Sequence, residues 1–436
     1  MAGYGTTSMS TFLFMPESAY GPTNNCIGIG NVLSSMGHRV VFAAEASWDG
    51  KLAALGFEED LVNLSAPAPA AEGAPQDDAG QFWIDFIHDT SPEFRKPTIE
   101  QLTTFVQPTW QALIDGAMYC QPQMLEIIDR VRPDVIIEDN VNCFPALLTA
   151  GVPFVRMMSC NPLEMTGPDV APTFSGYAAD DRTGWAEFRE EYDRTHRSMW
   201  EAFNEWVTAC GAPPLDDLQF IHQSGALNLY TYPSIADYID RRPLNETWHR
   251  LESSVRSTDE PFVIPSSLGA ARDGALIYLS LGSLGSADVG LMKRLVAILA
   301  ATPHRYIVSK GPLADTYDLP DNMWGAAQVP QTNVLPLVEL VITHAGNNTT
   351  TECFHFGKPM IALPLFWDQY DNAQRVDETG FGVRLPTYDF EDAQLTGAIT
   401  RLLADTALHS RMTTNASAIR AADGAQHAAA LIAGLV

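Results

Sequence analysis

The chain has 436 residues, of which 46% are hydrophobic and 18% are charged. It carries 26 lysines and arginines against 53 aspartates and glutamates, which gives a formal net charge of −27. Such an acidic excess repels a phosphate backbone and an anionic membrane surface, so nucleic acid and lipid head groups are poor partners. The length and the apolar content predict two domains, each with its own core.

The cysteines and the N-terminal residues exclude further classes of protein. The run at residues 11–15 is too short for a signal or a membrane span and follows no basic segment. We therefore expect a cytoplasmic protein without membrane insertion. Buried free thiols, with neither a zinc site nor a disulfide framework, are expected because no C-x-x-C pair occurs. The cysteines are Cys26, Cys120, Cys143, Cys160, Cys210 and Cys353.

Short apolar, β-branched runs alternate with helical patterns along both halves of the chain. In the first half the runs cover residues 11–15, 38–44, 134–139 and 152–158. In the second half they cover residues 275–283, 305–310, 340–346 and 359–365. Strands that alternate with helices are joined by right-handed crossovers and build parallel sheets. The pattern therefore predicts an α/β protein with two parallel sheets.

A polar, turn-rich segment between the two series predicts a linker at residues 251–274. It separates an N-terminal domain (1–250) from a C-terminal domain (275–436). Residues 65–80, rich in Ala, Pro and Gly, predict a mobile loop, and residues 185–207 predict a long amphipathic helix. Two α/β domains that face one another form a cleft, and ligands of such sheets bind beyond the carboxyl ends of the strands.

The strongest chemical signal is the segment 342–373, ITHAGNNTTTECFHFGKPMIALPLFWDQYDNA. It reads as a strand, a turn at Gly346 and a helix that begins with the polar run 347–351. Free N–H groups and the positive end of the dipole at such a helix start bind a phosphate, although the same residues can be ordinary caps. His344 at the strand exit can donate an N–H or a full charge to a diphosphate, or be structural.

Asp368 and Gln369, after the next strand, offer an acceptor pair and an amide, groups that hold sugar hydroxyls. Residues 329–373 resemble the signature box of the family 1, UDP-sugar-dependent glycosyltransferases, with V-P-Q, H-x-G-x-N-S/T-x-x-E, G-x-P-M and D-Q-x-x-N-A. Weaker likeness covers most of the remaining chain and is least distinctive between residues 162 and 274. The resemblance implies the GT-B fold, in which two Rossmann-like domains face across a cleft and the C-terminal one binds the donor.

The resemblance also implies a role for each matching residue. The glutamine that ends the box is associated with glucose donors, so UDP-glucose is the first co-substrate expected, with no other cofactor and no metal. Val329 and Gln331 would contact the uracil, and Glu352 would accept from the ribose hydroxyls. Asp368 and Gln369 would bind the sugar. The diphosphate would be held by Ser283, His344, Gly346, Asn348 and Thr349.

One departure from the family pattern concerns the nucleotide base. The family has a tryptophan before V-P-Q that stacks on the base, whereas this chain has Gln328. Aromatic stacking contributes about 0.5 to 1.5 kcal/mol beyond area burial. Trp324 is close enough in sequence to be a substitute, and a dTDP-sugar remains an alternative donor.

The second departure concerns the catalytic base. In the family a histidine near the first helix deprotonates the acceptor hydroxyl and a distant aspartate orients it. Here Pro22 stands at the histidine position, while Asp139 matches the aspartate. Asp139 is therefore the predicted base, acting directly or through water if burial raises its pKa, or else a strand-end carboxylate with a structural hydrogen bond. The alternative bases are Glu17, Glu138 and His88.

The G-x-G at Gly28 and Gly30 lies about thirteen residues after the first strand, with Leu33 where a third glycine would stand. A dinucleotide-binding turn needs its glycines directly at the strand end. The two glycines are instead expected to let a helix pack closely on its sheet.

These observations predict an inverting, metal-independent hexosyltransferase that acts on a hydroxyl of a hydrophobic small molecule. The alternatives are a GT-B epimerase of nucleotide sugars and a nucleotide-sugar-binding protein without catalysis. The acceptor is expected to contact aromatic and methionine side chains of the N-terminal domain, although each such residue is more often part of a core than of a pocket. The candidates are Phe82, Trp83, Phe86, Trp110, Met157 and Trp200.

Overall fold

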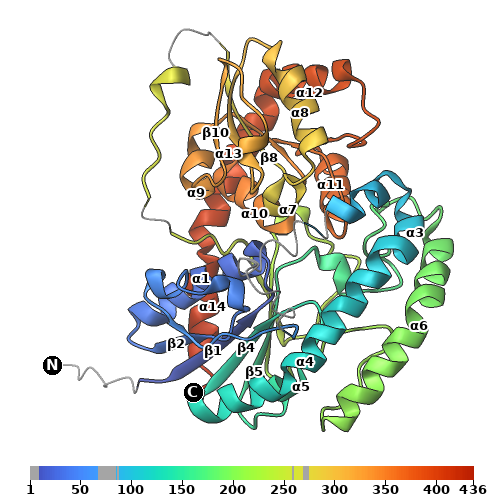
Figure 1. Ribbon diagram of the computed structural model, residues 1–436, viewed down its shortest axis with the longest axis vertical. Helices are drawn as coiled ribbons and strands as arrows, with labels where there is room; N and C mark the ends of the chain where they lie inside the picture. Colours follow the sequence, from blue (N-terminus) through green and yellow to red (C-terminus); the bar gives the residue numbers. More distant parts are fainter. Residues whose placement is uncertain (1–8, 67–84, 86–87, 258–259, 269–273) are drawn as a thin grey trace, which may run out of the picture.

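The computed structural model describes residues 9–66, 85, 88–257, 260–268 and 274–436. Two lobes, each built on one parallel sheet, lie one above the other (Figure 1). The predicted α/β class with two parallel sheets is confirmed. Figure 1 also shows that the lower lobe comes mainly from the first half of the chain and the upper lobe from the second.

The first sheet has seven strands in the order β3-β2-β1-β4-β5-β6-β7. Its central strands are almost fully buried and mostly apolar, as expected of a parallel sheet covered by helices on both faces. Its strands are β1 (Thr11–Pro16), β2 (Arg39–Phe42), β3 (Glu58–Glu59), β4 (Val135–Asp139), β5 (Phe154–Met158), β6 (Leu227–Thr231) and β7 (Trp248–Leu251). The accompanying helices are α1 (Tyr20–Ser35), α3 (Thr98–Gln101), α4 (Gln107–Val131), α5 (Pro145–Leu148) and α6 (Trp185–Ala209), the last of which confirms the predicted amphipathic helix.

The second sheet has six strands in the order β10-β9-β8-β11-β12-β13. Its strands are β8 (Leu276–Ser280), β9 (Arg305–Ser309), β10 (Met323–Ala326), β11 (Leu340–Thr343), β12 (Met360–Ala362) and β13 (Gly382–Arg384). The helices are α7 (Gly282–Gly285), α8 (Val289–Ala300), α9 (Gln331–Val334), α10 (Asn347–Phe356), α11 (Gln369–Glu378), α12 (Asp392–Ala404), α13 (Thr406–Ala422) and α14 (Gly424–Ala433). The strand order reverses between β8 and β11, as it does between β1 and β4 in the first sheet, and each reversal opens a crevice at the carboxyl ends of the strands.

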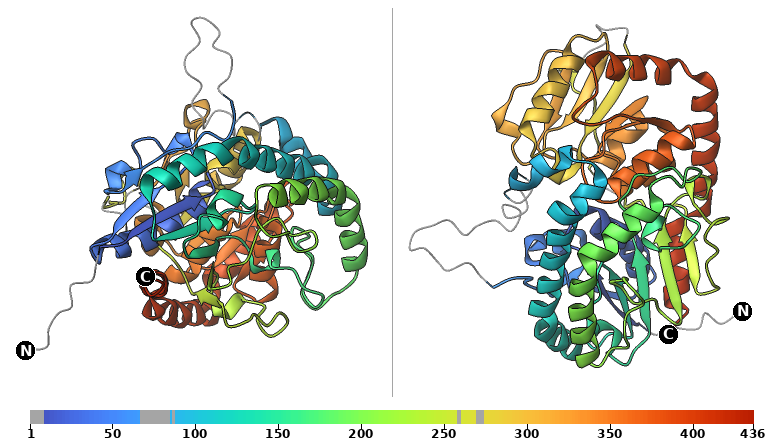
Figure 2. Two further views of the ribbon diagram at one scale, coloured as in Figure 1. Left: turned by 90° about the horizontal axis from the view of Figure 1, so that it is seen from below. Right: turned by 90° about the vertical axis from the view of Figure 1, so that its right-hand side faces the viewer.

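The last helix leaves the second lobe and packs on the first. Figure 2 shows the C-terminal helices running down one side of the molecule to the first sheet. Ala428, Ala429 and Ile432 of α14 belong to the same buried cluster as Phe12 and Ile29. The predicted C-terminal domain, residues 275–436, thus ends in a helix that ties the two lobes together.

Helix α1 explains the glycines of the G-x-G. A Cβ on Gly30 would lie 3.1 Å from the Phe57 ring and 3.4 Å from Val40, so this glycine allows close packing on the sheet as predicted. A Cβ on Gly28 would instead lie 3.2 Å from Ser254, in the predicted linker. Gly28 therefore brings the helix against the connection between the lobes.

All the cysteines are free, and Cys160 and Cys210 are the partly exposed ones. The prediction of free thiols is confirmed. Within the part of the chain that the structure describes, no helix is both long and apolar enough to cross a bilayer.

Candidate active site

The two crevices face one another, so that the start of α1 meets the start of α10. A Cβ on Gly21 would lie 3.5 Å from Asn348 Cβ. The turn that replaces the family's histidine motif and the predicted diphosphate helix are therefore in contact across the cleft.

Helix α10 begins without a side-chain cap among the described residues, because its N-cap is Gly346. Asn347 donates through Nδ2 to the backbone oxygens of Ser159 (3.1 Å) and Thr231 (3.3 Å), both in the first lobe. Asn348 donates to Glu352 Oε1 at 3.0 Å. The polar residues of the first turn thus bind other groups, and the helix N-terminus keeps its N–H groups and its positive dipole end for an anion. Of the two interpretations left open by the sequence, the geometry favours anion binding over ordinary capping.

His344 is held between two glycines at the carboxyl end of β11. A Cβ on Gly282 would lie 2.7 Å from its ring, and one on Gly346 would lie 2.5 Å from Nε2. Burial lowers the pKa of His344 to about 4. The imidazole is therefore neutral at pH 7, so that it offers an N–H rather than the full charge that the sequence left open.

Glu352, the predicted ribose ligand, is 1% exposed and is the centre of a hydrogen-bond network. Its Oε1 accepts from Arg256 Nη1 at 2.8 Å as well as from Asn348, and its Oε2 accepts from Gln331 Nε2 at 2.5 Å. The same Gln331 amide lies 3.3 Å from Thr349 Oγ1. The structure thus brings Gln331, Asn348, Thr349 and Glu352 together as the resemblance implied.

Two members of this network were missed by sequence reasoning. Tyr278 in β8 donates its hydroxyl to Gln331 Oε1 at 3.1 Å, and Arg256 comes from the linker. Tyr278 begins the run 278–285, which has only a weak likeness to the family and did not mark this residue as a ligand. Arg256 belongs to no motif, and only the chain's return from the first lobe brings it to this network.

The remaining residues of the uracil and diphosphate sets belong to other elements of the second lobe. Ser283 falls in α7 beside Gly282, and Val329 packs partly buried against the main core. Gln328 is exposed. Trp324 was suggested above as a substitute for the tryptophan that stacks on the nucleotide base. Its ring packs on Phe262 at the edge of the sheet, with 5.4 Å between the ring centroids.

Asp368 and Gln369, the predicted sugar ligands, are both buried and hydrogen-bonded at the start of α11. Asp368 Oδ2 accepts from Asn161 N of the first lobe at 2.8 Å, and burial raises the pKa of this carboxyl to about 6. Gln369 Oε1 accepts from Leu365 N at 3.1 Å. In this structure Asp368 therefore joins the lobes, and its carboxylate faces the segment that follows β5.

The rest of α11 also grips the first lobe. Asp371 accepts from Phe174 N at 2.6 Å and from Gly176 N at 2.8 Å. Arg375 donates to the backbone oxygens of Ala236 (2.7 Å) and Asp237 (2.6 Å). The structure is thus a closed arrangement of the two lobes.

Asp139 ends β4 and is 3% exposed. Its carboxylate accepts from Ser159 N at 3.1 Å, Ser159 Oγ at 2.5 Å and Cys26 Sγ at 3.8 Å. Ser159 Oγ also accepts from Asn25 Nδ2 at 2.9 Å. Burial raises the pKa of Asp139 to about 6, near the value that suits a general base. Ser159 and Cys26 are thus the side-chain donors to this carboxylate.

The alternative bases have other environments. Glu138 is 1% exposed and pairs with the fully buried Arg156 at 2.8 Å, which is a structural ion pair. Glu17 binds Ala19 N and Ser18 Oγ, both at 3.0 Å, just before α1. His88 is exposed beside Asp89.

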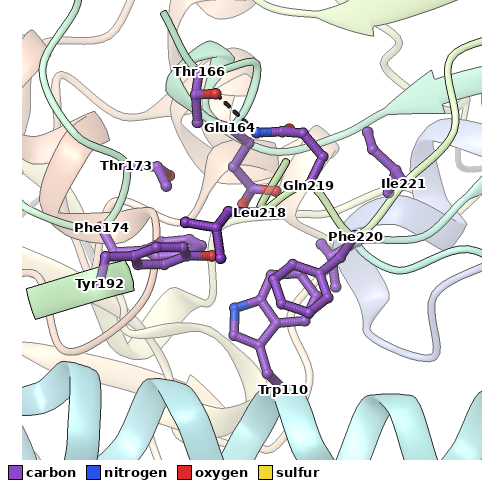
Figure 3. Close-up of a pocket in the computed structure, with 11 residues that line it drawn as sticks. Trp110, Glu164, Thr166, Thr173, Phe174, Tyr192, Leu218, Gln219, Phe220 and Ile221 are labelled. Carbon is purple, nitrogen blue, oxygen red and sulfur yellow. Dashed lines mark hydrogen bonds between the residues drawn. The ribbon is translucent and has the colours of Figure 1, made fainter. Parts of the chain in front are cut away.

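A pocket with aromatic walls lies in the first lobe between α4, α6 and three connecting segments (Figure 3). Trp110 stacks on Phe220 at 4.2 Å between centroids, and Phe174 lies 4.5 Å from Trp367. The pocket is lined by Trp110, Val141, Glu164, Thr166, Thr173, Phe174, Tyr192, Leu218, Gln219, Phe220 and Ile221.

Of the predicted acceptor contacts, only Trp110 lines this pocket. Met157 is wholly buried under the first sheet, so its place in the acceptor set was wrong. Trp200 is partly buried and donates through Nε1 to Gln219 O at 2.8 Å. Phe82, Trp83 and Phe86 lie outside the described residues.

Comparison with known proteins shows which families and structures this chain resembles. Residues 293–433 match the family described as erythromycin biosynthesis protein CIII-like, C-terminal domain. The chain is 32% identical to the NDP-glycosyltransferase YjiC of Bacillus subtilis over 37% of this chain and 42% of that protein, so the match spans less than half of that relative. It is 22% identical to the demethyllactenocin mycarosyltransferase of Streptomyces fradiae over 99% of this chain and 88% of that protein.

Two solved structures share the fold along nearly the whole chain. The glycotransferase of kitacinnamycin superposes with a TM-score of 0.69 at 20% identity and covers 98% of this chain and 99% of that chain. The glycosyltransferase VinC in complex with dTDP superposes with a TM-score of 0.65 at 17% identity, with coverage of 98% and 99%.

The two parallel sheets, their facing crevices and these structural likenesses define a GT-B protein. The signature box, the match of residues 293–433 and the similar glycosyltransferases support a likeness to the family 1 glycosyltransferases.

Proposed function

We propose that the protein transfers a hexose, with glucose from UDP-glucose as the first donor, to a hydroxyl of a hydrophobic small molecule. The observation that carries this proposal is the uncapped start of α10, which faces Gly21 of α1 and has His344 beside it. A leaving diphosphate requires such a set of N–H donors and a dipole, and the facing surface is where an acceptor approaches.

The reaction is proposed to be a single displacement with inversion. The acceptor oxygen forms a bond to the anomeric carbon while the bond from that carbon to the diphosphate breaks and its electron pair leaves with the diphosphate. The N-terminus of α10 and the neutral His344 stabilise the charge that develops there, which requires no metal.

The acceptor proton is proposed to reach Asp139. Pro22 has no basic group that could take this proton. The polar side chain nearest to the Asp139 carboxylate is Ser159. Ser159 Oγ can take the proton from the acceptor hydroxyl as it gives its own to Asp139 Oδ2, 2.5 Å away. The raised pKa of Asp139 makes the carboxylate a stronger base than an exposed aspartate.

Two donor nucleotides, UDP and dTDP, are tested. UDP-glucose follows from the resemblance of the signature box, which ends in Gln369. VinC is described in complex with dTDP, and the Streptomyces fradiae relative is named a mycarosyltransferase, so dTDP-sugars with other hexoses form the alternative.

The proposal is tested by mass-spectrometric assay of UDP-glucose and dTDP-glucose against phenols, terpenoids and macrolides, repeated with Asp139→Asn. Asp139→Asn is expected to lower turnover by on the order of 10²-fold or more and to leave donor affinity within about twofold. Unchanged turnover would remove Asp139 from the mechanism. An epimerised donor formed without acceptor would favour the epimerase, and tight UDP binding without any turnover would favour a binding protein.

A further inference from the structure

We propose that the acceptor carries a protonated amine, and that the aromatic pocket of the first lobe binds this ammonium group against Glu164. This inference rests on the proposed function, because it names the class of acceptor that the same cleft receives. The hydroxyl to be glycosylated belongs to the same molecule.

The pocket walls present several aromatic rings to one small volume. Figure 3 shows Trp110, Phe220, Phe174 and Tyr192 around a common space, with Glu164 at its edge. These rings come from elements far apart in sequence, which is typical of a ligand site built at the meeting of helices and loops. Aromatic faces attract a cation through their quadrupole, by about 0.5 to 2 kcal/mol per contact.

Glu164 lies between this pocket and the donor side. It ends the short 3-10 turn Pro162–Glu164, which follows β5, and its Oε1 accepts from Trp367 Nε1 at 3.2 Å. Trp367 directly precedes Asp368 and Gln369, the residues predicted to hold the sugar. An acceptor bound at Glu164 therefore lies next to the transferred group.

Glu164 has no basic partner within the pocket. None of the described residues that line the pocket is basic. Burial raises the pKa of Glu164 to about 8, the negative charges of Asp368 and Asp371 add to this, and hydrogen bonds from the Cys160 thiol and the Trp367 indole oppose it. Tyr192 also faces Glu164. Burial and the charge of Glu164 raise the pKa of Tyr192, so its hydroxyl is neutral.

An ammonium ligand would supply the missing charge. It would ion-pair with Glu164, and its approach is favoured by the formal charge of −27 on the whole chain. With a neutral acceptor, the Glu164 carboxyl group would stay protonated or would lack a charged partner.

A second polar group points to a ligand in the same pocket. Thr173 is 8% exposed, lines the pocket, and its hydroxyl has no hydrogen-bond partner among the described residues. Buried hydroxyls are rarely left without a partner. An amine N–H can donate to this oxygen while it pairs with Glu164. Since no described group of His, Cys, Asp and Glu is arranged to hold a metal ion, the carboxylates near the pocket do not form a metal site.

The test compares two probes of nearly the same shape on the full-length chain, N,N-dimethylbenzylamine and its neutral analogue isobutylbenzene. Quenching of tryptophan fluorescence reports binding beside Trp110 and Trp367, and calorimetry in buffers of different ionisation enthalpy reports proton exchange. We expect the amine to bind at least about tenfold more tightly than the neutral probe and to release a proton at pH 7, as Glu164 loses its own.

Glu164→Gln is expected to abolish both the tenfold preference and the proton release. Glu190→Gln, which removes one negative charge from an exposed position on α6, is the matched control and should change neither. Equal affinities for the two probes, or a preference that survives Glu164→Gln, would overturn the proposal.

The failure of this inference is distinguishable from failure of the proposed function. UDP binding and sugar transfer to neutral acceptors are measured on the same preparations. Sugar transfer to neutral phenols, without a preference for amines, would contradict only the proposal that the acceptor is an amine. A preference for amines that depends on Glu164, without transfer to any acceptor, would support the ammonium site and contradict the proposed transferase activity.

Discussion

The donor side and the acceptor side of the cleft are built in opposite ways. Most of the donor side comes from one continuous segment, in which strand ends, glycines and a helix start are placed by local rules. The acceptor side is assembled from α4, α6 and connecting loops that lie far apart in the sequence. The first type of site is specified by backbone geometry, and the second by packing of side chains.

The comparison teaches where substitutions act. On the donor side a single added methyl group is expected to be decisive, because glycines let the backbone approach closely. On the acceptor side the loss of one group among many is expected to change selectivity and to leave the fold and the donor site in place. The predictions below test this contrast on the donor side and at the junction.

Gly346→Ala is expected to have the largest effect. The added Cβ would lie 2.5 Å from His344 Nε2, so the ring or the start of α10 must move. We expect UDP affinity to fall by about 100-fold or more, because the diphosphate donors lose their arrangement. Calorimetric titration with UDP measures the change. Gly397→Ala in α12, where a Cβ meets no atom within 4 Å, is the control and should bind UDP normally.

If Gly346→Ala bound UDP as tightly as the unaltered protein, the start of α10 would not be the diphosphate site. Gly397→Ala shows whether a glycine substitution in this lobe lowers UDP affinity in general. Thermal melts of both variants check that each is folded.

Arg256→Ala is expected to have an intermediate effect. The guanidinium pairs at 2.8 Å with Glu352, which is almost fully buried, so its removal leaves an uncompensated carboxylate beside the diphosphate helix. We expect UDP affinity to fall by about tenfold, or roughly 1.4 kcal/mol. Arg401→Ala, an exposed arginine on α12, removes the same charge and should have no such effect. A tighter complex with UDP would show instead that Arg256 competes with the nucleotide.

The same contrast explains how much the sequence predicted. The alternation of strands and helices and the start of α10 follow from local patterns. The signature box singled out Gln331, Asn348 and Glu352, and the structure shows the hydrogen bonds that join them. Glu164 and Arg256 could not be found in this way, because tertiary packing alone gives each its role. Met157 was misplaced for the same reason, since an apolar side chain in a strand can face a core or a pocket.

Asp371 lies at the junction of the two sides, and its effect is expected to be the smallest. It belongs to α11 and accepts from Phe174 N and Gly176 N, in the segment that also forms the pocket wall. Burial raises its pKa to about 8, helped by Asp368 and opposed by those two N–H groups and by Arg384. The native state therefore holds a proton that the unfolded chain loses near pH 4, and stability falls as pH rises between about 4 and 8.

Asp371→Asn removes this titration while one amide oxygen can still accept a hydrogen bond. We expect the melting temperature of the unaltered protein to fall from pH 5.5 to 8.5, and that of Asp371→Asn to fall by less, from a lower starting value at pH 5.5. Asp389→Asn, at an exposed position of the same lobe, should keep the unaltered slope. If the melting temperature of Asp371→Asn fell as steeply with pH as that of the unaltered protein, Asp371 would not carry the pH dependence. It would then come from the other buried carboxyls whose pKa is raised, which are those of Glu138, Asp139, Glu164 and Asp368. A smaller slope would show that this carboxyl, which joins the two lobes, carries part of the pH dependence of stability.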